Sequence, residues 1–166
     1  LTMEEVKYYF IIIGCSILII FINIFQSCSS VFEALRHSAF QVGSIITTTG
    51  FCTVDFDLWP GNAKTVLVLL MFVGACAGST GGGIKVSRFV IAVKTLGKEL
   101  TSYVHPKSVK KIHFERKPVE HDVVRSINVY FITFLIIFCG SLFLVSLEEY
   151  DLVTNFTAVA ATINNI

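Results

Sequence analysis

The stretch "GSIITTTGFCTVDFDLWP", residues 43–60, places three threonines, a glycine and a phenylalanine between an apolar run and a small acidic loop. A β-branched triplet closed by glycine fits two very different structures. One is the end of a strand in a soluble domain, and the other is the narrow part of an ion pathway inside a membrane. The rest of the chain has to decide between them.

The composition is that of a membrane protein. Of 166 residues, 54% are hydrophobic and 15% are charged, and the mean hydropathy is +0.73, far from an ordinary soluble domain. The formal net charge is +1 and the basic residues are confined to one region, so a nucleic-acid partner is not indicated. The five cysteines form no C-x-x-C pair, and we interpret them as small apolar residues.

Three long apolar runs predict membrane-spanning helices. The first, residues 8–25, has 18 nearly uncharged residues, which in a helix extend roughly 27 Å and so nearly cross a bilayer core. A signal peptide is the alternative, but "TMEEVK" before the run lacks a basic segment and the run is long. The second run, residues 63–96, holds a glycine cluster and predicts a broken helix. The third, residues 123–147, predicts another spanning helix.

Between the first two runs, residues 29–46 have apolar positions at helical spacing but include Glu33, Arg36 and His37. This segment is too polar to face lipid, so we expect a short helix that dips into a protein-lined space. Glu33 and Arg36 are three residues apart on one helical face and are predicted to pair, with cation attraction as the alternative role.

The distribution of charge predicts the topology. Residues 97–122 contain six Lys or Arg, whereas the other connections carry only acidic charge, so the positive-inside rule makes 97–122 a cytoplasmic loop. An internal repeat agrees with this topology. Thr49 and Ile166 are separated by 117 positions (166 minus 49), and the same shift carries residues 8–25 into the third apolar run. A second re-entrant helix is then expected at 152–163, and a second filter segment begins at 164–166.

At membrane depth, backbone outside a helix is tolerated only where it is buried in protein or lines a water-filled cavity. Residues 47–51 offer consecutive carbonyl and hydroxyl oxygens that can replace the water shell of an alkali cation. Gly50 permits the backbone angles that this requires, and the preceding helix directs its partly negative end toward the ion. The alternative is a buried loop that closes a helical hairpin.

The glycine cluster predicts an unwound segment inside the second run. Each of Gly78, Gly81, Gly82 and Gly83 disfavours helix by about 1 kcal/mol relative to alanine. The segment is expected ~22 Å along the helix from its outer end, on the cytoplasmic side of the filter. A gate could act there, with Lys85 placing a positive charge near the pathway. The alternative is close helix packing through Gly74-x-x-x-Gly78. A phosphate-binding loop is disfavoured, because Ile84 separates the glycines from Lys85 and no strand precedes them.

Together, "TTTGF", "CAGSTGGGIKVSR" and "TINNI" make the chain resemble the Trk/Ktr/HKT superfamily of potassium transporters, in its TrkH-type membrane subunit. The resemblance implies an all-α membrane protein with potassium-channel-like helix, pore-helix, helix repeats and re-entrant filter loops. Residues 1–96 match the third repeat and residues 123–166 part of the fourth. The chain begins at Leu1 and stops without a helix or turn ending, so we expect a fragment of a longer protein.

The resemblance also assigns roles to residues. The backbone oxygens that bind K+ are those of Thr48, Thr49, Asn165 and Ile166. The rest of the first filter segment is Thr47, Gly50 and Phe51. The intramembrane gate loop comprises Gly78, Ser79, Thr80, Gly81, Gly82, Gly83 and Lys85.

The activity implied is uptake of K+ or Na+ by a multi-pass protein of the bacterial inner membrane, possessing no enzymatic chemistry and no cofactor beyond the transported ion. The implied partners are the lipid bilayer, the remaining repeats of the full-length chain, a second copy in a homodimer, and a cytosolic nucleotide-binding regulatory subunit docked on residues 97–122. The alternatives are a potassium channel subunit with two filter loops, a P-loop nucleotide-binding protein, and a membrane scaffold without transport. Such a channel usually has a second glycine in its filter, and this chain has Cys52 at that position.

Overall fold

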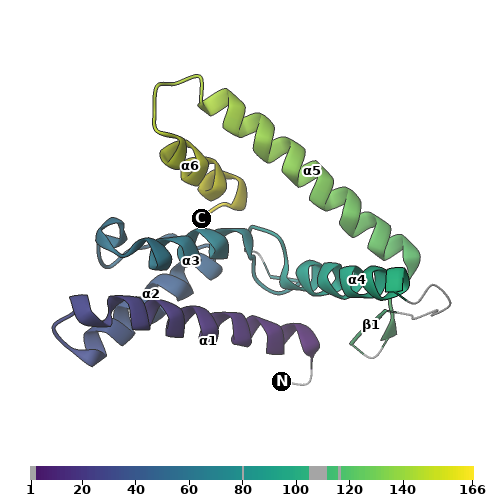
Figure 1. Cartoon of the computed structure of the whole chain (residues 1–166), viewed down its shortest axis with the longest axis horizontal. Helices are drawn as coiled ribbons and strands as arrows, with labels where there is room; N and C mark the ends of the chain where they lie inside the picture. The colour runs from purple at the N-terminus through teal and green to yellow at the C-terminus, as the bar shows by residue number, and fades with distance from the viewer. Residues whose placement is uncertain (1–2, 80, 105–111, 116) are drawn as a thin grey trace.

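The computed structural model describes residues 3–79, 81–104, 112–115 and 117–166. Six α-helices dominate this part of the chain (Figure 1). They are α1 (Glu4–Ile24), α2 (Val31–Ile46), α3 (Gly61–Phe72), α4 (Val86–Val104), α5 (His121–Val145) and α6 (Leu152–Asn164). Two 3-10 turns, Phe25–Ser27 and Phe56–Leu58, and a hairpin of β1 (His113–Phe114) with β2 (Lys117–Pro118) complete the described elements.

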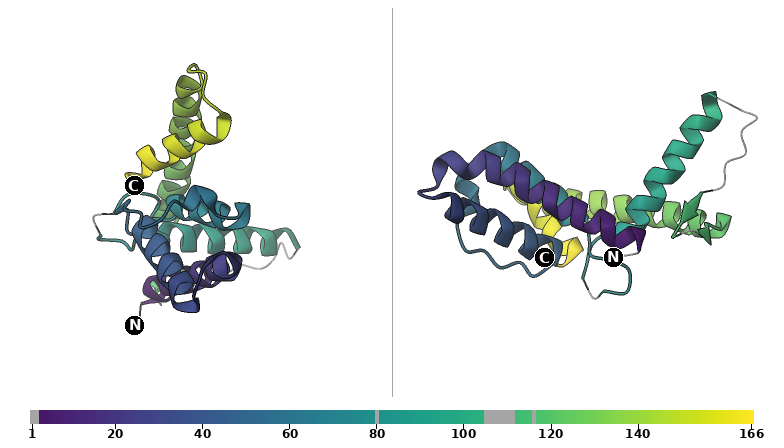
Figure 2. Two further views of the ribbon diagram at one scale, coloured as in Figure 1. Left: turned by 90° about the vertical axis from the view of Figure 1, so that its left-hand side faces the viewer. Right: turned by 90° about the horizontal axis from the view of Figure 1, so that it is seen from below.

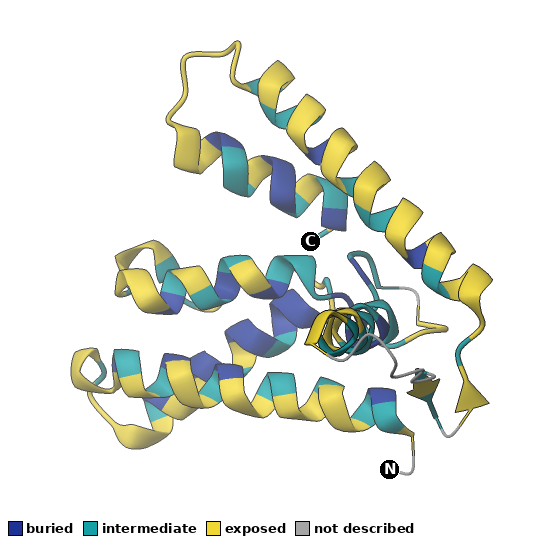
Figure 3. Ribbon diagram, turned by 45° about the vertical axis from the view of Figure 1, so that its right-hand side comes forward, coloured by how far each residue is buried: buried dark blue, intermediate teal, exposed yellow. Residues whose placement is uncertain are grey.

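Two helices are long and apolar enough to cross a membrane. They are α1 with the turn after it, Glu4–Ser27, and α5, His121–Val145. Few residues of either span are buried, and exposed residues, drawn in yellow, recur along both helices (Figure 3). A helix that is apolar yet exposed needs an apolar environment outside the chain, either lipid or further protein.

The core lies where α1, α2 and α3 meet, and α6 extends it. Ile20, Val42 and Leu67, one from each of the first three helices, are almost fully buried. The α5–α6 pair joins α3 through aromatic contacts of Phe72 with Phe138 and Phe156, whose ring centroids lie 5.5 and 6.1 Å away. Packing on α3 therefore brings the ends of α2 and α6 to the same region of the molecule.

The predicted Glu33–Arg36 pair is wrong. The buried face of α2 includes His37, whereas Arg36 is exposed. Glu33 Oε1 lies 3.7 Å from His37 Nε2, one turn along the helix, and Glu33 Oε2 accepts a hydrogen bond of 3.1 Å from the Ser29 N–H. Glu33 therefore caps the start of α2 and contacts a residue on its inner face.

The helix boundaries differ from the sequence expectation after the second apolar run. Helix α4 continues to Val104 instead of ending at residue 96, because a single glycine, Gly97, lowers helix stability by only about 1 kcal/mol within an amphipathic run. The predicted loop 97–122 therefore begins as helix and ends as the β1–β2 hairpin. Residues 105–111 and 116 of it lie outside the described residues.

Candidate functional site

Helix α2 ends in a Schellman turn. The Thr49 N–H donates to the Ser44 carbonyl at 2.8 Å and the Thr48 N–H donates to the Ile45 carbonyl at 3.0 Å. Thr48 has φ 57, in the left-handed region. A β-branched residue is strained there, and such strain persists only where the surrounding structure imposes it. Residues 47–51 are called the first turn below.

Helix α6 ends in the same turn. The Ile166 N–H donates to the Ala161 carbonyl at 3.0 Å, the Asn165 N–H donates to the Thr162 carbonyl at 3.3 Å, and Asn165 has φ 58. Each of these residues stands 117 positions after its counterpart in the first turn (166 minus 49, 165 minus 48). The repeat seen in the sequence is thus also a repeat of backbone geometry. Residues 164–166 are called the second turn.

The two turns lie against each other. A Cβ atom added at Gly50, which has φ +76, would stand 3.1 Å from the Ile166 carbonyl carbon. Seen from below, the C-terminus lies beside the end of α2 (Figure 2, right). Segments more than a hundred residues apart in the sequence therefore meet at one point.

Buried polar side chains of α2 hold the first turn in place. Ser44 Oγ donates to the Phe51 carbonyl at 2.6 Å, and the Gly50 N–H donates back to the Ser44 carbonyl at 3.3 Å. One turn earlier, Gln41 Nε2 approaches the Val54 carbonyl at 3.4 Å. Sequence reasoning missed Gln41 and Ser44, although their spacing of three residues within a segment expected to face protein was a usable signal.

The threonine hydroxyls are engaged within the protein. Thr47 Oγ1 donates to the Gly43 carbonyl at 2.7 Å and lies 2.8 Å from Thr49 Oγ1, while Thr48 Oγ1 accepts a long hydrogen bond from Gly82. Among the described residues, no hydrogen bond reaches the carbonyl oxygens of Thr47, Thr48, Thr49 or Gly50. The open oxygens of the first turn are therefore those of the backbone.

The glycine loop, residues 73–85 with Thr80 outside the described residues, separates α3 from α4. Its two ends are fastened together, since the Gly74 N–H donates to the Ile84 carbonyl at 2.8 Å and the Ile84 N–H donates to the Phe72 carbonyl at 3.2 Å. The apolar run is therefore interrupted, as the glycines indicated. The alternative of helix packing through Gly74-x-x-x-Gly78 is wrong, because neither glycine is in a helix.

This loop touches both turns. Gly82 packs so closely on the backbone of the fully buried Asn164 that no Cβ would fit there, and the Gly82 N–H lies 3.4 Å from Thr48 Oγ1. Gly81 and Gly83 also face these turns, whereas a Cβ at Gly78 would meet nothing within 4 Å. Only part of the predicted gate segment is therefore in contact with the predicted filter.

Lys85 folds back on the loop instead of pointing its charge into open space. Its Nζ donates to the Ser79 carbonyl and Oγ, both at 3.0 Å, and to the Gly81 carbonyl at 2.6 Å. The ammonium group thereby links Ser79 and Gly81 at the tip of the loop. Asn164 is a buried polar residue beside the loop: its Nδ2 donates to the Ala160 carbonyl at 2.7 Å, and its Oδ1 has no hydrogen-bond partner among the described residues.

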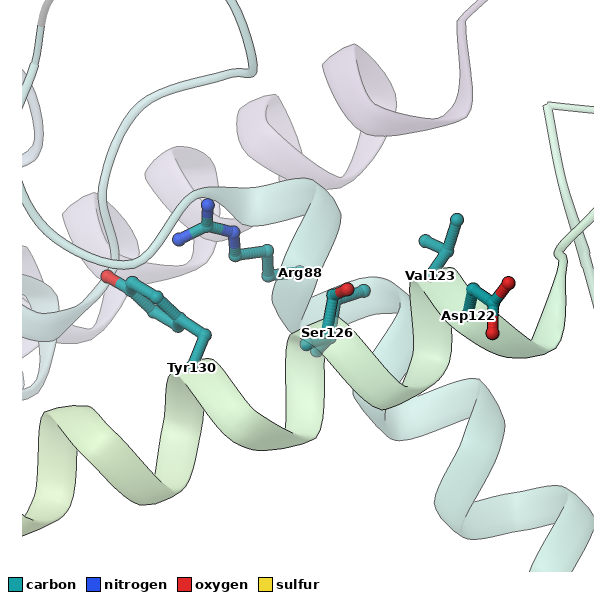
Figure 4. Close-up of a pocket in the computed structure, with 6 residues that line it drawn as sticks. Arg88, Asp122, Val123, Ser126 and Tyr130 are labelled. Carbon is teal, nitrogen blue, oxygen red and sulfur yellow. The ribbon is translucent and has the colours of Figure 1, made fainter.

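A separate cavity of about 280 Å³ lies between α4 and α5 (Figure 4). In it the Arg88 guanidinium carbon stands 3.9 Å from the centroid of the Tyr130 ring. The lining residues are Arg88, Asp122, Val123, Ser126, Ile127 and Tyr130. None of them belongs to the two turns or to the glycine loop, so the cavity is distinct from the predicted ion site.

Thr48→Asn is expected to raise the stability of the protein by about 1 kcal/mol, because asparagine tolerates the left-handed conformation and the β-branched threonine does not. Asn165 already occupies the equivalent position of the second turn. The thermal unfolding midpoint of the detergent-solubilised complete protein measures the gain. Thr47→Asn is the control, since Thr47 has φ −89 and gains nothing. An equal or lower midpoint for Thr48→Asn would contradict the assignment of strain.

Comparison with known proteins gives consistent matches. The family model TrkH, described as "Cation transport protein", matches residues 9–166. The Trk system potassium uptake protein TrkH of Halomonas elongata is 36% identical over 134 residues, which are 81% of this chain and 28% of that protein. TrkH of Escherichia coli K12 is 31% identical over 156 residues, which are 94% of this chain and 32% of that protein.

The fold also matches a solved structure. The crystal structure of the potassium transporter TrkH from Vibrio parahaemolyticus superimposes with a TM-score of 0.90 at 32% sequence identity. The match covers 97% of this chain and 35% of that one. The chain therefore spans about a third of the length of the relatives it matches.

Proposed function

This chain belongs to the TrkH family of cation transport proteins, integral inner-membrane transporters rather than enzymes, and from that premise we propose that it forms part of a K+ uptake pathway. The relatives it matches are named potassium uptake proteins. The observation that carries the proposal is the pair of equivalent turns, whose ends meet and whose first member leaves its backbone carbonyls open.

We propose that these carbonyls form part of a selectivity filter. The cation would be bound by backbone oxygens of Thr48, Thr49, Asn165 and Ile166, with Thr47, Gly50 and Phe51 shaping the first turn. Neutral carbonyls suit a dehydrated alkali cation. The C-terminal ends of α2 and α6, each carrying a partial negative charge, stop at the two turns and favour a cation there.

The proposed architecture is potassium-channel-like. In it α1, α2 and the broken α3–α4 pair form one helix, pore-helix, helix repeat over residues 1–96, while α5 and α6 form most of a second over residues 123–166. The shared turn geometry, 117 residues apart, supports this correspondence. The exposed apolar faces of α1 and α5 would contact lipid or further repeats of the transporter. A homodimer and a nucleotide-binding regulatory subunit at residues 97–122 stay predictions.

The glycine loop is the proposed gate. It lies against both turns through Gly82, and its tip is closed by Lys85. Loop backbone in that place would obstruct an ion leaving the filter toward the cytoplasm. Its five glycines leave little side-chain bulk, so a small movement of the loop would change the passage. The proposed gate therefore consists of Gly78 to Gly83 and Lys85, with Gly81 and Gly82 nearest the proposed ion path.

A potassium channel with two filter loops is the second candidate function. The sequence disfavours it, because Cys52 follows Phe51 where such channels carry a second glycine. Membership of a transporter family leaves the nucleotide-binding alternative without support.

Uptake of radioactive Rb+ by the complete protein in a bacterial host that lacks its own K+ uptake tests the proposal. We expect saturable uptake that unlabelled K+ inhibits at much lower concentration than Li+ does, because carbonyl oxygens replace the water shell of the larger ions more readily. The host without the protein provides the background. Absence of uptake above that background, or equal inhibition by all alkali cations, would overturn the proposal.

A further inference from the structure

Glu5, near the start of α1, is a buried carboxylate that neither the proposed filter nor the proposed gate uses. Glu5 is 5% exposed, although it lies in the first turn of a long, mostly apolar helix of which little is buried. A carboxylate that is removed from water is strongly unfavourable unless hydrogen-bond donors replace the lost water. The donors that surround Glu5 therefore indicate what it does.

One donor lies within the glycine loop and the other lies just after it, at the start of α4. Glu5 Oε1 accepts a hydrogen bond of 2.7 Å from the Ala77 N–H, which lies within the loop immediately before Gly78. The same oxygen accepts one of 3.1 Å from the Ser87 N–H, in the first turn of α4. The N–H groups of a first helical turn have no partner within the helix, so an anion is favoured there. One carboxylate oxygen thus ties the loop and the helix after it to α1.

We propose that Glu5 is the positioning residue that holds the glycine loop against the two turns, an inference that rests on the gate assigned above. The loop has its own ties, at its base through Gly74 and Ile84 and at its tip through Lys85. These join the loop to itself, so they preserve its shape wherever it moves. Of the hydrogen bonds described for the loop, the one from the Ala77 N–H to Glu5 joins the loop to the long helix α1.

The neighbouring residue provides a matched control. Glu4 is also acidic and also bonded, but its Oε2 accepts from Lys94 Nζ at 2.6 Å, in the middle of α4, and not from the loop. Lys94 Nζ in turn donates to the His113 carbonyl of the hairpin at 2.9 Å. Glu4→Ala therefore removes a carboxylate and an ion pair at the same end of α1 while leaving the loop tied.

The test measures the loop directly through Cys76, which lies in it beside Ala77 and is partly exposed. In the complete protein, every cysteine other than Cys76 is replaced by serine, including Cys15, Cys28, Cys52 and Cys139. Cys76 is then modified by a membrane-impermeant thiol reagent from the cytoplasmic side of inside-out vesicles. Glu5→Ala is expected to raise the modification rate about tenfold, as befits the loss of hydrogen bonds to a charged acceptor. The Glu5→Gln side chain can accept the same hydrogen bonds through its uncharged amide oxygen, so its modification rate is expected to lie between those of the wild type and Glu5→Ala. Glu4→Ala is expected to react at the wild-type rate.

Rb+ uptake in the same variants supplies the second readout. Glu5→Ala is expected to raise the maximal rate and leave the KM for Rb+ unchanged, because the filter oxygens are not touched, and Glu5→Gln should restore most of the wild-type rate. An unchanged Cys76 rate in Glu5→Ala, the same increase in Glu4→Ala, or a parallel change of KM would overturn the inference. If Cys76 responds as expected but the wild-type protein takes up no Rb+, the positioning role stands and the proposed transport function fails.

Discussion

Gly82→Ala is expected to raise the maximal rate of Rb+ uptake sharply, because the added methyl group cannot share space with the backbone of Asn164. Asn164 is fully buried at the end of α6 and its side chain is bonded to Ala160, so the loop is the partner that has to move. Overpacking at a buried contact destabilises the packed arrangement by about 3 kcal/mol. That energy shifts the ratio of closed to open loop by roughly a hundredfold.

Gly81→Ala is the matched control for this effect. A Cβ there would approach the Ala75 side chain at 3.3 Å and Thr48 Oγ1 at 3.6 Å, contacts that a small adjustment accommodates. We expect Gly81→Ala to change the maximal rate far less than Gly82→Ala does, in membranes that contain equal amounts of each protein. A Gly82→Ala protein that transports at the wild-type rate, or more slowly, would show that the loop does not obstruct the path.

The elements of this fold follow from local sequence signals. The long apolar runs predict α1 and α5, because an apolar run of this length forms a stable helix in an apolar environment such as a bilayer. The glycine cluster marks the interruption between α3 and α4, because helix propensity is a local property. Helix α4 runs past its predicted end for a related reason: a lone glycine does not stop a helix whose apolar face still packs through Val90 and Ile91.

The sequence predicts which residues of the candidate site are equivalent where the internal repeat supplies a second copy of the turn. The shift of 117 pairs Thr48 with Asn165, and both adopt the left-handed conformation. The partner of Glu33 was not accessible, since spacing alone permits residues three or four positions on. The buried face of α2, which includes Ala34, His37 and Gln41, selects His37.

Contacts between distant segments were inaccessible to any local pattern. The Glu5 hydrogen bond to Ala77 joins residues 72 positions apart, and in the sequence Glu5 resembles an ordinary acidic residue flanking a membrane helix. The closeness of Gly82 to Asn164 likewise depends on how α6 packs on α3. Sequence patterns indicated which residues are unusual, whereas tertiary packing determines which of them meet.

Gly50 occupies the point where the two turns touch, and its conformation disfavours residues with a side chain. With φ +76 it lies in the left-handed region, where a side chain costs about 1–2 kcal/mol. A Cβ would in addition stand 3.1 Å from the Ile166 carbonyl carbon, closer than ordinary contact. Any side chain at this position therefore displaces the second turn relative to the first and changes the spacing of the carbonyl oxygens proposed to bind K+.

Gly50→Ser is accordingly expected to raise the KM for Rb+ by about tenfold, the factor that corresponds to 1.4 kcal/mol of lost cation binding, and to let Na+ compete with Rb+ more effectively. Competition of K+ and Na+ with Rb+ uptake measures both changes. Gly43→Ser is the control, because a Cβ at Gly43, within α2, would meet nothing within 4 Å. The two substitutions add the same side chain, but only Gly50 lies at the contact between the two turns. Unchanged affinity and selectivity in Gly50→Ser would show that the two turns do not lie on the cation path, because the spacing of the carbonyl oxygens at their contact would then not affect cation binding.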